Sequence, residues 1–174
     1  MKQWYPTIIA MLPSPRYSPP RSFTITFYKD MGGVAVTSGT HISGSAAWYR
    51  NNMTGEGVGS IVHEMVHVVQ QFGSARVPLW LTEGSADYVR FYRFEPQTHG
   101  ADIRPADAAK ARYDASYRTS ANFLNWVSNR YDPNLVPELN SAIRQGAYKD
   151  NLWQKFTGHS LENLGAEWKN SIGQ

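Results

Sequence analysis

The sequence has no cysteine among its 174 residues. A disulfide framework is therefore excluded, and so is a structural zinc site of the usual kind, whose four protein ligands normally include cysteine. A chain without cysteine suits both reducing and oxidising compartments, so this absence does not indicate where the protein works.

Long apolar runs are missing as well. No stretch approaches the ~18 to 20 consecutive apolar residues that a membrane-spanning helix needs, so we expect no membrane partner. The apolar segment from Ile8 to Leu12 is too short, and too soon interrupted by Pro13, for a secretory signal. We expect either that a signal was removed or that the protein is not exported.

A strong charge of either sign is also absent. The chain carries 17 Lys and Arg against 14 Asp and Glu, and its pI of about 9.2 rests on this small excess. A nucleic-acid-binding domain concentrates its basic residues in a stripe, whereas those of this chain are scattered, so we expect no nucleic-acid partner. With 41% hydrophobic and 13% aromatic residues, residues 1–174 are expected to form a single domain, and the chain is expected to be a monomer.

The most informative segment is His63-Glu64-Met65-Val66-His67, an HExxH motif. If the residues around it form a helix, apolar side chains cover nearly the whole circumference of that helix, which predicts that it is buried. Residues four apart lie on one helix face, roughly 5 to 6 Å apart at their base, so His63 and His67 can share one Zn²⁺ ion per chain. Glu64 is free to be the catalytic residue that takes a proton from the attacking water. The alternative, a chance spacing of two histidines, is disfavoured because three buried polar side chains are costly unless something binds them.

A catalytic zinc ion takes three protein ligands and keeps one position open. The best candidate for the third ligand is Glu83, 16 positions after His67 (83 − 67), because this interval fits a turn and a second helix that returns beside the first. Gly84-Ser85 would let these two helices approach closely. We expect Asp87, one turn after Glu83, to accept a hydrogen bond from the far nitrogen of His63 and so orient that ring. The alternative, two ordinary exposed acids near a helix start, stays open.

The HExxH motif followed by Glu83-x-x-x-Asp87 resembles the pattern of the gluzincin metallopeptidases, the thermolysin-like and aminopeptidase-like enzymes. The segments Val62–Gln70 and Leu81–Arg90, with Trp4-Tyr5-Pro6 and Ile42 to Trp48 before them, are similar to the basic secretory protein family of plants and bacteria. That family is regarded as secreted zinc peptidases linked in plants to defence. The resemblance covers most of the chain and implies a secreted zinc metallopeptidase acting on a peptide or protein substrate.

Attack on an amide creates an oxyanion that a second electrophilic group should stabilise. The segment from Tyr113 to Val127 resembles the helix start at which aminopeptidase-like gluzincins place an oxyanion-binding tyrosine, and this resemblance implies that catalytic role for Tyr117. Tyr113, Tyr88 and His99 are the substitutes. A structural Tyr117, with its hydroxyl bonded to a carbonyl, is a further alternative.

These residues together predict a zinc-dependent metallopeptidase in which Glu64 assists the attack of water on a peptide bond. One alternative is a non-catalytic protein that keeps the zincin fold and captures a peptide or glycan in defence. A protein that binds zinc but cleaves no substrate would fit this alternative. Another alternative is a hydrolase of a non-peptide amide or ester, because zinc-bound hydroxide can attack the carbonyl group of any of these compounds.

The order of elements predicts an α+β, zincin-like fold. We expect a small, mostly antiparallel sheet in residues 1–56, then the active-site helix and a mainly helical lobe in residues 57–174. Strands are expected over residues 23–27, 34–37 and 41–48, and helices over 6–12, 58–72, 79–92, 116–129, 135–145 and 160–170. The strand nearest the cleft is expected to be 39–45, whose free edge would hold an extended peptide by main-chain hydrogen bonds.

Three histidines lie outside the motif, and we expect none of them to bind metal. His41, on a predicted strand, could line the substrate cleft, but we favour an ordinary position at the surface or in the core. His99 lies in the polar segment 95–107 and could approach the site only if that segment folds over it. His159 lies in a turn before the last helix and is expected to face solvent.

Overall fold

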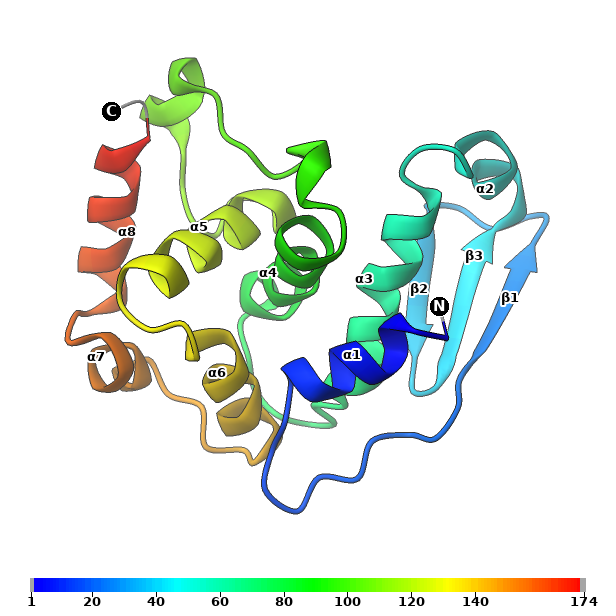
Figure 1. Cartoon of the computed structure of the whole chain (residues 1–174), viewed down its shortest axis with the longest axis horizontal. Coiled ribbons are helices and arrows are strands. Elements are labelled where there is room, and N and C mark those ends of the chain that lie inside the picture. Colours follow the sequence, from blue (N-terminus) through cyan, green and yellow to red (C-terminus); the bar gives the residue numbers. More distant parts are fainter. Residues whose placement is uncertain (1, 173–174) are drawn as a thin grey trace.

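The computed structural model describes residues 2–172 and has a small sheet on one side, a larger helical part on the other, and the long helix α3 between them (Figure 1). The chain is thus a mixed α+β protein with a mostly helical remainder, as the sequence predicted. In chain order the elements are α1 (Trp4–Met11), β1 (Thr24–Tyr28), β2 (Ala35–Ser38), β3 (His41–Ser45), α2 (Ala46–Asn52), α3 (Gly57–Gln70), α4 (Leu79–Val89), the π-helical turn η1 (Arg90–Phe94), the 3-10 turns η2 (Pro96–Thr98) and η3 (Pro105–Lys110), α5 (Tyr117–Arg130), α6 (Leu135–Arg144), α7 (Asn151–Thr157) and α8 (Leu161–Ser171).

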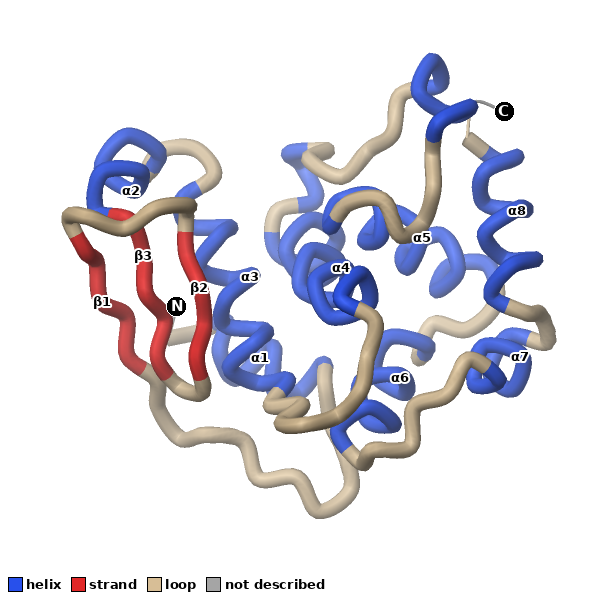
Figure 2. The backbone as a smooth tube through the Cα atoms, turned by 180° about the vertical axis from the view of Figure 1, so that it is seen from behind, coloured by secondary structure: helices blue, strands red, loops and turns tan. Residues whose placement is uncertain are grey.

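Within the described residues the strands form one three-stranded sheet in the order β1-β3-β2 (Figure 2). β2 and β3 are antiparallel and are joined through Gly39, whose φ of 58° suits a tight turn. β1 joins the other side of β3 and runs parallel to it. The expectation of a mostly antiparallel sheet is therefore wrong, because one of the two pairings is parallel. Alternation along a strand indicates which face is buried, but it does not specify the pairing partner.

The expected position of strand 39–45 at the free edge is also wrong. β3 is paired on both sides, and the edge strands are β1 and β2, of which β2 lines the cleft. β3 also ends earlier than expected, because the Ser45 hydroxyl accepts a hydrogen bond from the Trp48 backbone nitrogen at 3.3 Å and caps helix α2. A strand continuing to Trp48 is excluded by this cap.

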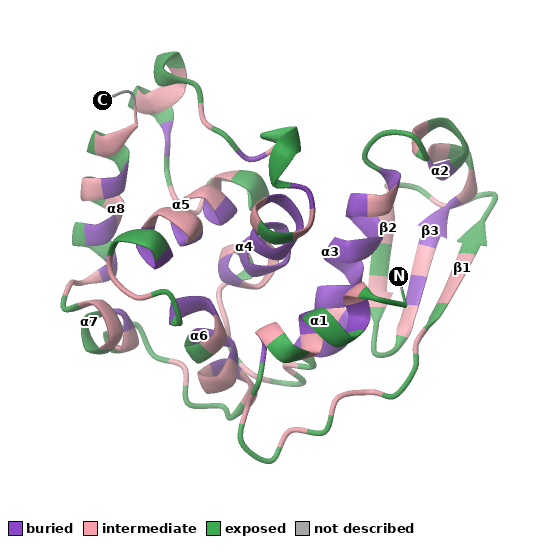
Figure 3. Ribbon diagram, viewed as in Figure 1, coloured by how far each residue is buried: buried purple, intermediate pink, exposed green. Residues whose placement is uncertain are grey.

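Helix α3 lies in the middle of the molecule and is buried along most of its length (Figure 3). Its Val62 and Val66 are fully buried, as are Ile42 on the inner sheet face, Ile8 of α1 and Leu81 of α4. α3 contacts β2, α1 and α4. Because neighbours surround it, the helix that carries the HExxH motif is held in position by apolar packing.

Helix α4 packs most extensively against α5. A Cβ atom added at Gly84 would lie 2.5 Å from the Ser120 Cβ of α5. From the sequence, Gly84 was expected to let α4 approach α3 closely. Gly84 does permit a close approach between helices, but the partner of α4 there is α5. At its C-terminal end α4 passes directly into η1, which accounts for the longer helix expected over 79–92.

The remaining helices begin and end within two residues of their expected bounds. Ser116 and Ser160 accept hydrogen bonds from the backbone nitrogens of Thr119 and Asn163, so each caps its helix. Helices α2 and α7 were not predicted. None of the helices between residues 2 and 172 is long and apolar enough to cross a membrane.

Candidate metal centre

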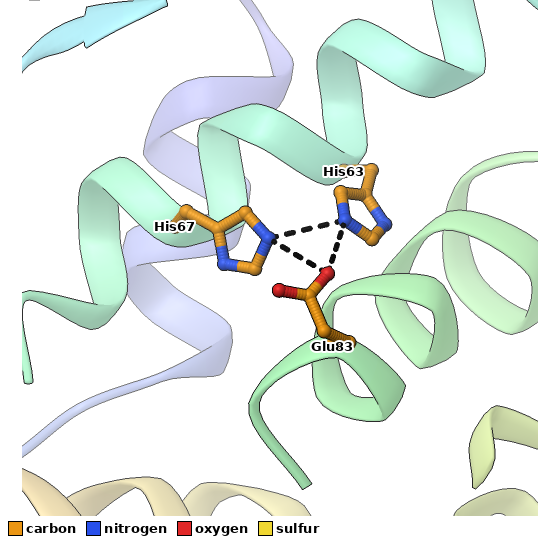
Figure 4. Close-up of side chains that lie close together, drawn as sticks. All are labelled: His63, His67 and Glu83. Carbon is orange, nitrogen blue, oxygen red and sulfur yellow. Dashed lines mark hydrogen bonds and ion pairs between the residues drawn. The ribbon is translucent and has the colours of Figure 1, made fainter. Parts of the chain in front are cut away.

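Two helices bring three candidate ligands together. His63 and His67 project from one face of α3, and Glu83 reaches them from the first turns of α4 (Figure 4). The two Nε2 atoms are 3.1 Å apart, and Oε2 of Glu83 lies 3.1 Å from that of His63 and 3.4 Å from that of His67. An ion about 2.0 to 2.1 Å from each donor in a tetrahedral site requires donor separations of roughly 3.3 Å. The three atoms therefore match the face of such a tetrahedron, and this group could hold a metal ion.

The protonation of the two rings supports the same conclusion. Nδ1 of His63 lies 2.6 Å from Oδ1 of Asp87, and Nδ1 of His67 lies 2.7 Å from Oε1 of Gln70. Both oxygens are acceptors, so both Nδ1 atoms donate. In a neutral ring the Nε2 lone pair is then free. It points into the triangle formed by the two Nε2 atoms and Oε2 of Glu83. Two nitrogen lone pairs and a carboxylate at about 3 Å repel one another unless a positive charge lies between them.

Gln70 was not predicted to take part in this site. Its amide nitrogen donates to the Thr82 carbonyl oxygen at 3.1 Å, which fixes the orientation of the amide and turns Oε1 toward His67. Gln70 is only 2% exposed. Its position three residues after His67, on the same helix face, was a signal that could have indicated this contact from the sequence.

The electrostatics of the triangle also favour a cation. Burial lowers the pKa of His63, but hydrogen bonds to Asp87 and Glu83 outweigh it and raise that pKa to about 9. For Glu83, burial acts to raise the pKa, yet the hydrogen bonds with His63 and His67 lower it to about 2. The site therefore stabilises positive charge next to an ionised carboxylate. A metal ion and a proton on His63 would compete for this position.

Glu64 follows His63 on α3 and points toward the sheet. It is 8% exposed, and its Oε2 accepts a 2.6 Å hydrogen bond from the Thr37 hydroxyl of β2. This contact was not predicted, because Thr37 precedes Glu64 by 27 residues and lies on a different element.

Tyr117 is the first residue of α5, and its ring stacks over that of His63 with centroids 6.2 Å apart. Its pKa is raised, chiefly by the negative charge of Glu83 and then by burial. The three substitutes lie elsewhere: Tyr113 packs on Trp80 and Phe123, Tyr88 is buried beside Arg93, and His99 is exposed and paired with Asp102. Of the four, only Tyr117 lines the cleft.

The triangle opens into a cleft with two hollows of about 720 and 650 Å³. Ala35, His63, Glu64 and Tyr117 line both hollows, so they mark the junction between them. The larger hollow extends along β2 toward the end of α3, where residues 70–73 line it. The cleft thus lies between the edge strand of the sheet and the helical part.

The smaller hollow ends in a network of charges. The Arg118 and Arg90 guanidinium groups both donate to Oε2 of Glu56, at 2.7 and 3.1 Å, and Arg90 also donates to the buried Glu95 at 2.6 Å. Desolvation acts to raise the pKa of Glu56, but the hydrogen bonds from Arg118 and then Arg90 outweigh it and lower that pKa. Two positive and two negative groups balance, so this end of the cleft carries little net charge.

The other histidines lie away from the triangle. His41 bonds the Thr24 hydroxyl at 2.7 Å on the sheet and lines neither hollow, which agrees with the favoured surface position and not with the cleft. His99 pairs with Asp102, and His159 lies 3.3 Å from Glu167. The only group of three or more metal-binding side chains within residues 2–172 is His63, His67 and Glu83.

The model of one protein family, BSP, described as peptidase of plants and bacteria, matches residues 3–168. The match includes every residue of the cleft described above. No curated protein and no solved structure matches the chain.

Proposed function

The chain belongs to the basic secretory protein family, the peptidases of plants and bacteria, and from this premise we propose that it is a zinc-dependent metallopeptidase of the gluzincin type with a zincin-like fold. One observation carries the proposal: the ligand atoms of His63, His67 and Glu83 converge in a cleft that Glu64 also lines. Two imidazoles and one carboxylate, without cysteine, form a ligand set typical of catalytic zinc.

We assign the metal to His63, His67 and Glu83, with one zinc ion per chain. Asp87 and Gln70 hold the two imidazoles in the tautomer that presents Nε2, because each accepts the Nδ1 proton of one ring. A zinc ion in this position would polarise a peptide carbonyl group and make water a nucleophile at neutral pH.

Glu64 is the proposed general base. Its carboxylate lines both hollows of the cleft and directly follows His63, so it lies beside the position where water would attack. Glu64 would take a proton from the attacking water and deliver it to the leaving amine, which needs that proton to depart.

Tyr117 is the proposed oxyanion donor. Its hydroxyl is protonated at neutral pH, since the ordinary pKa of tyrosine is about 10, and the negative charge of Glu83 raises that pKa further. A neutral phenol can donate a hydrogen bond to the oxygen that becomes negative during attack. The Tyr117 ring lies over His63 at the mouth of the cleft, which supports this role.

A peptide or protein substrate follows from membership of a peptidase family. We propose that its main chain pairs with the free edge of β2, whose residues Ala35 to Thr37 line the larger hollow. Main-chain pairing holds an extended peptide with little dependence on its sequence. β2 replaces strand 39–45 in this role because β3 has no free edge.

The cleft needs both parts of the chain, since β2 supplies one wall and α3, α4 and α5 supply the rest. We therefore propose that residues 1–174 work as one domain, and that the chain is a monomer. The name of the family indicates secretion, which we extend to this protein.

The test is a Glu64→Gln variant. Because Gln is nearly isosteric with Glu but cannot accept the proton, we expect about one zinc ion per chain to remain bound and cleavage of a mixed peptide library to be lost. Metal content and cleavage products would be measured before and after chelation, with Glu162→Gln on the exposed face of α8 as a matched control. An active Glu64→Gln protein would overturn the mechanism, and zinc binding without cleavage by the wild type would favour a non-catalytic binding protein.

A further inference from the structure

We propose that Thr37 is the positioning residue of the general base: its hydroxyl binds Oε2 of Glu64 and leaves Oε1 as the oxygen that exchanges the proton. This inference rests on the proposed function. It concerns a residue of the edge strand β2, outside the HExxH motif and outside the metal-binding group.

The hydrogen bond has an unambiguous direction. The Thr37 hydroxyl lies 2.6 Å from Oε2 of Glu64 and 3.1 Å from the Glu64 backbone oxygen. It has one proton, and an ionised carboxylate can only accept. Both the shorter distance and the negative charge favour the carboxylate as the partner, which makes this a charge-assisted hydrogen bond.

The position of the hydroxyl is fixed by the sheet. Thr37 pairs with the fully buried Ile42 of β3, so its side chain shares the face of the sheet that packs on α3. Its neighbour Val36 is 55% exposed on the opposite face. Threonine is branched at Cβ and has few side-chain conformations on a strand. A rigid donor of this kind holds the longer and more flexible side chain of Glu64 in one conformation.

Glu64 has few other constraints. In the part of the chain that the structure describes, no second hydrogen bond reaches its carboxylate. Oε1 is therefore the oxygen left to accept a proton, and Glu64 faces both hollows of the cleft. Without the Thr37 hydroxyl, the carboxylate could rotate and either oxygen could face the sheet.

The same strand then has two functions. β2 holds the general base through Thr37, and its free edge is where we place the substrate main chain. One strand would thus contact both the base, which α3 carries, and the substrate, and this contact would support the alignment that proton transfer requires.

The test compares Thr37→Val, which keeps the shape but removes the hydroxyl, with Thr37→Ser, which keeps the hydroxyl. For Thr37→Val we expect kcat to fall about 10- to 100-fold, the size typical of a lost hydrogen bond to a charged group, with KM and zinc content unchanged. Thr37→Ser should keep most of the wild-type kcat. Thr26→Val on β1 is a matched control in the same sheet, because Thr26 lines neither hollow.

A second comparison ties the effect to Glu64. If Thr37 acts through the base, adding Thr37→Val to Glu64→Gln should not lower further any slow background rate that Glu64→Gln retains. Should Thr37→Val lower the melting temperature more than Thr26→Val does, Thr37→Ala provides a second variant without the hydroxyl, compared with Thr37→Ser at a temperature where both are folded.

The outcomes separate the two proposals. A wild type without cleavage would refute the proposed function, and this inference with it. An active wild type and an inactive Glu64→Gln, together with Thr37→Val at the wild-type kcat, would overturn the Thr37 inference alone. A Thr37→Val protein that loses zinc, or in which only KM changes, would also overturn it, because neither result follows from a misplaced base.

Discussion

The contact between Gln70 and His67 offers the most direct test of how the metal centre is built. We choose Gln70→Leu, which fills a similar volume but removes the oxygen that accepts the His67 Nδ1 proton. Gln70 is buried and makes two side-chain hydrogen bonds, to His67 at 2.7 Å and to the Thr82 carbonyl oxygen at 3.1 Å. Its removal leaves a partly buried Nδ1–H without a partner and allows the other tautomer, in which the ligand atom Nε2 carries the proton.

The expected size follows from this change. Loss of a group that orients a metal-binding histidine typically weakens metal binding about 10- to 100-fold. This corresponds to about 1.4 to 2.7 kcal/mol in binding free energy. The upper part of the range is expected here, because Gln70 also connects α3 to α4, the helix that supplies Glu83.

The assay is a competition titration of zinc against a chromophoric chelator at fixed pH. Gln70→Glu keeps an acceptor for His67 and should bind zinc more tightly than Gln70→Leu, although it loses the donor to Thr82. Gln71→Asn is a matched control, because Gln71 is an exposed amide whose backbone is in the left-handed region (φ 41°), a conformation that Asn tolerates. If Gln70→Leu binds zinc as tightly as the wild type does, the argument from tautomers is refuted.

Two further predictions concern α4 and α5. Tyr117→Phe should lower kcat about 10²- to 10³-fold, as expected when an oxyanion donor is removed, while the zinc affinity stays constant; steady-state kinetics and the same titration check both, and an unchanged kcat would exclude the role given to Tyr117. Gly84→Ala should destabilise the fold by about 1 to 2 kcal/mol, because overpacking against Ser120 outweighs the gain in helix propensity. Urea unfolding measures this difference, and a more stable Gly84→Ala protein would show that α4 and α5 can separate at little cost.

The sequence by itself predicted what depends on local spacing. His63 and His67 lie on one face of α3 because four residues make about one helical turn, and Glu83 and Asp87 share a face of α4 for the same reason. The helix starts near Ser116 and Ser160 were also predicted, since a serine caps a helix through a backbone group only three residues away. In all these cases the relevant atoms are within one turn of one another, so the helix geometry suffices.

The tertiary structure alone decided the contacts between distant segments. The strand order β1-β3-β2 places β2, and not β3, at the cleft. The sequence could not predict this order, because alternation indicates the buried face of a strand but not its neighbour. The partner of Gly84 proved to be α5, since a glycine indicates a close approach but not which element approaches. Thr37 reaches Glu64 only because the sheet packs on α3. The local geometry of the ligands was therefore contained in the sequence, whereas the strand that holds the proposed base required the fold.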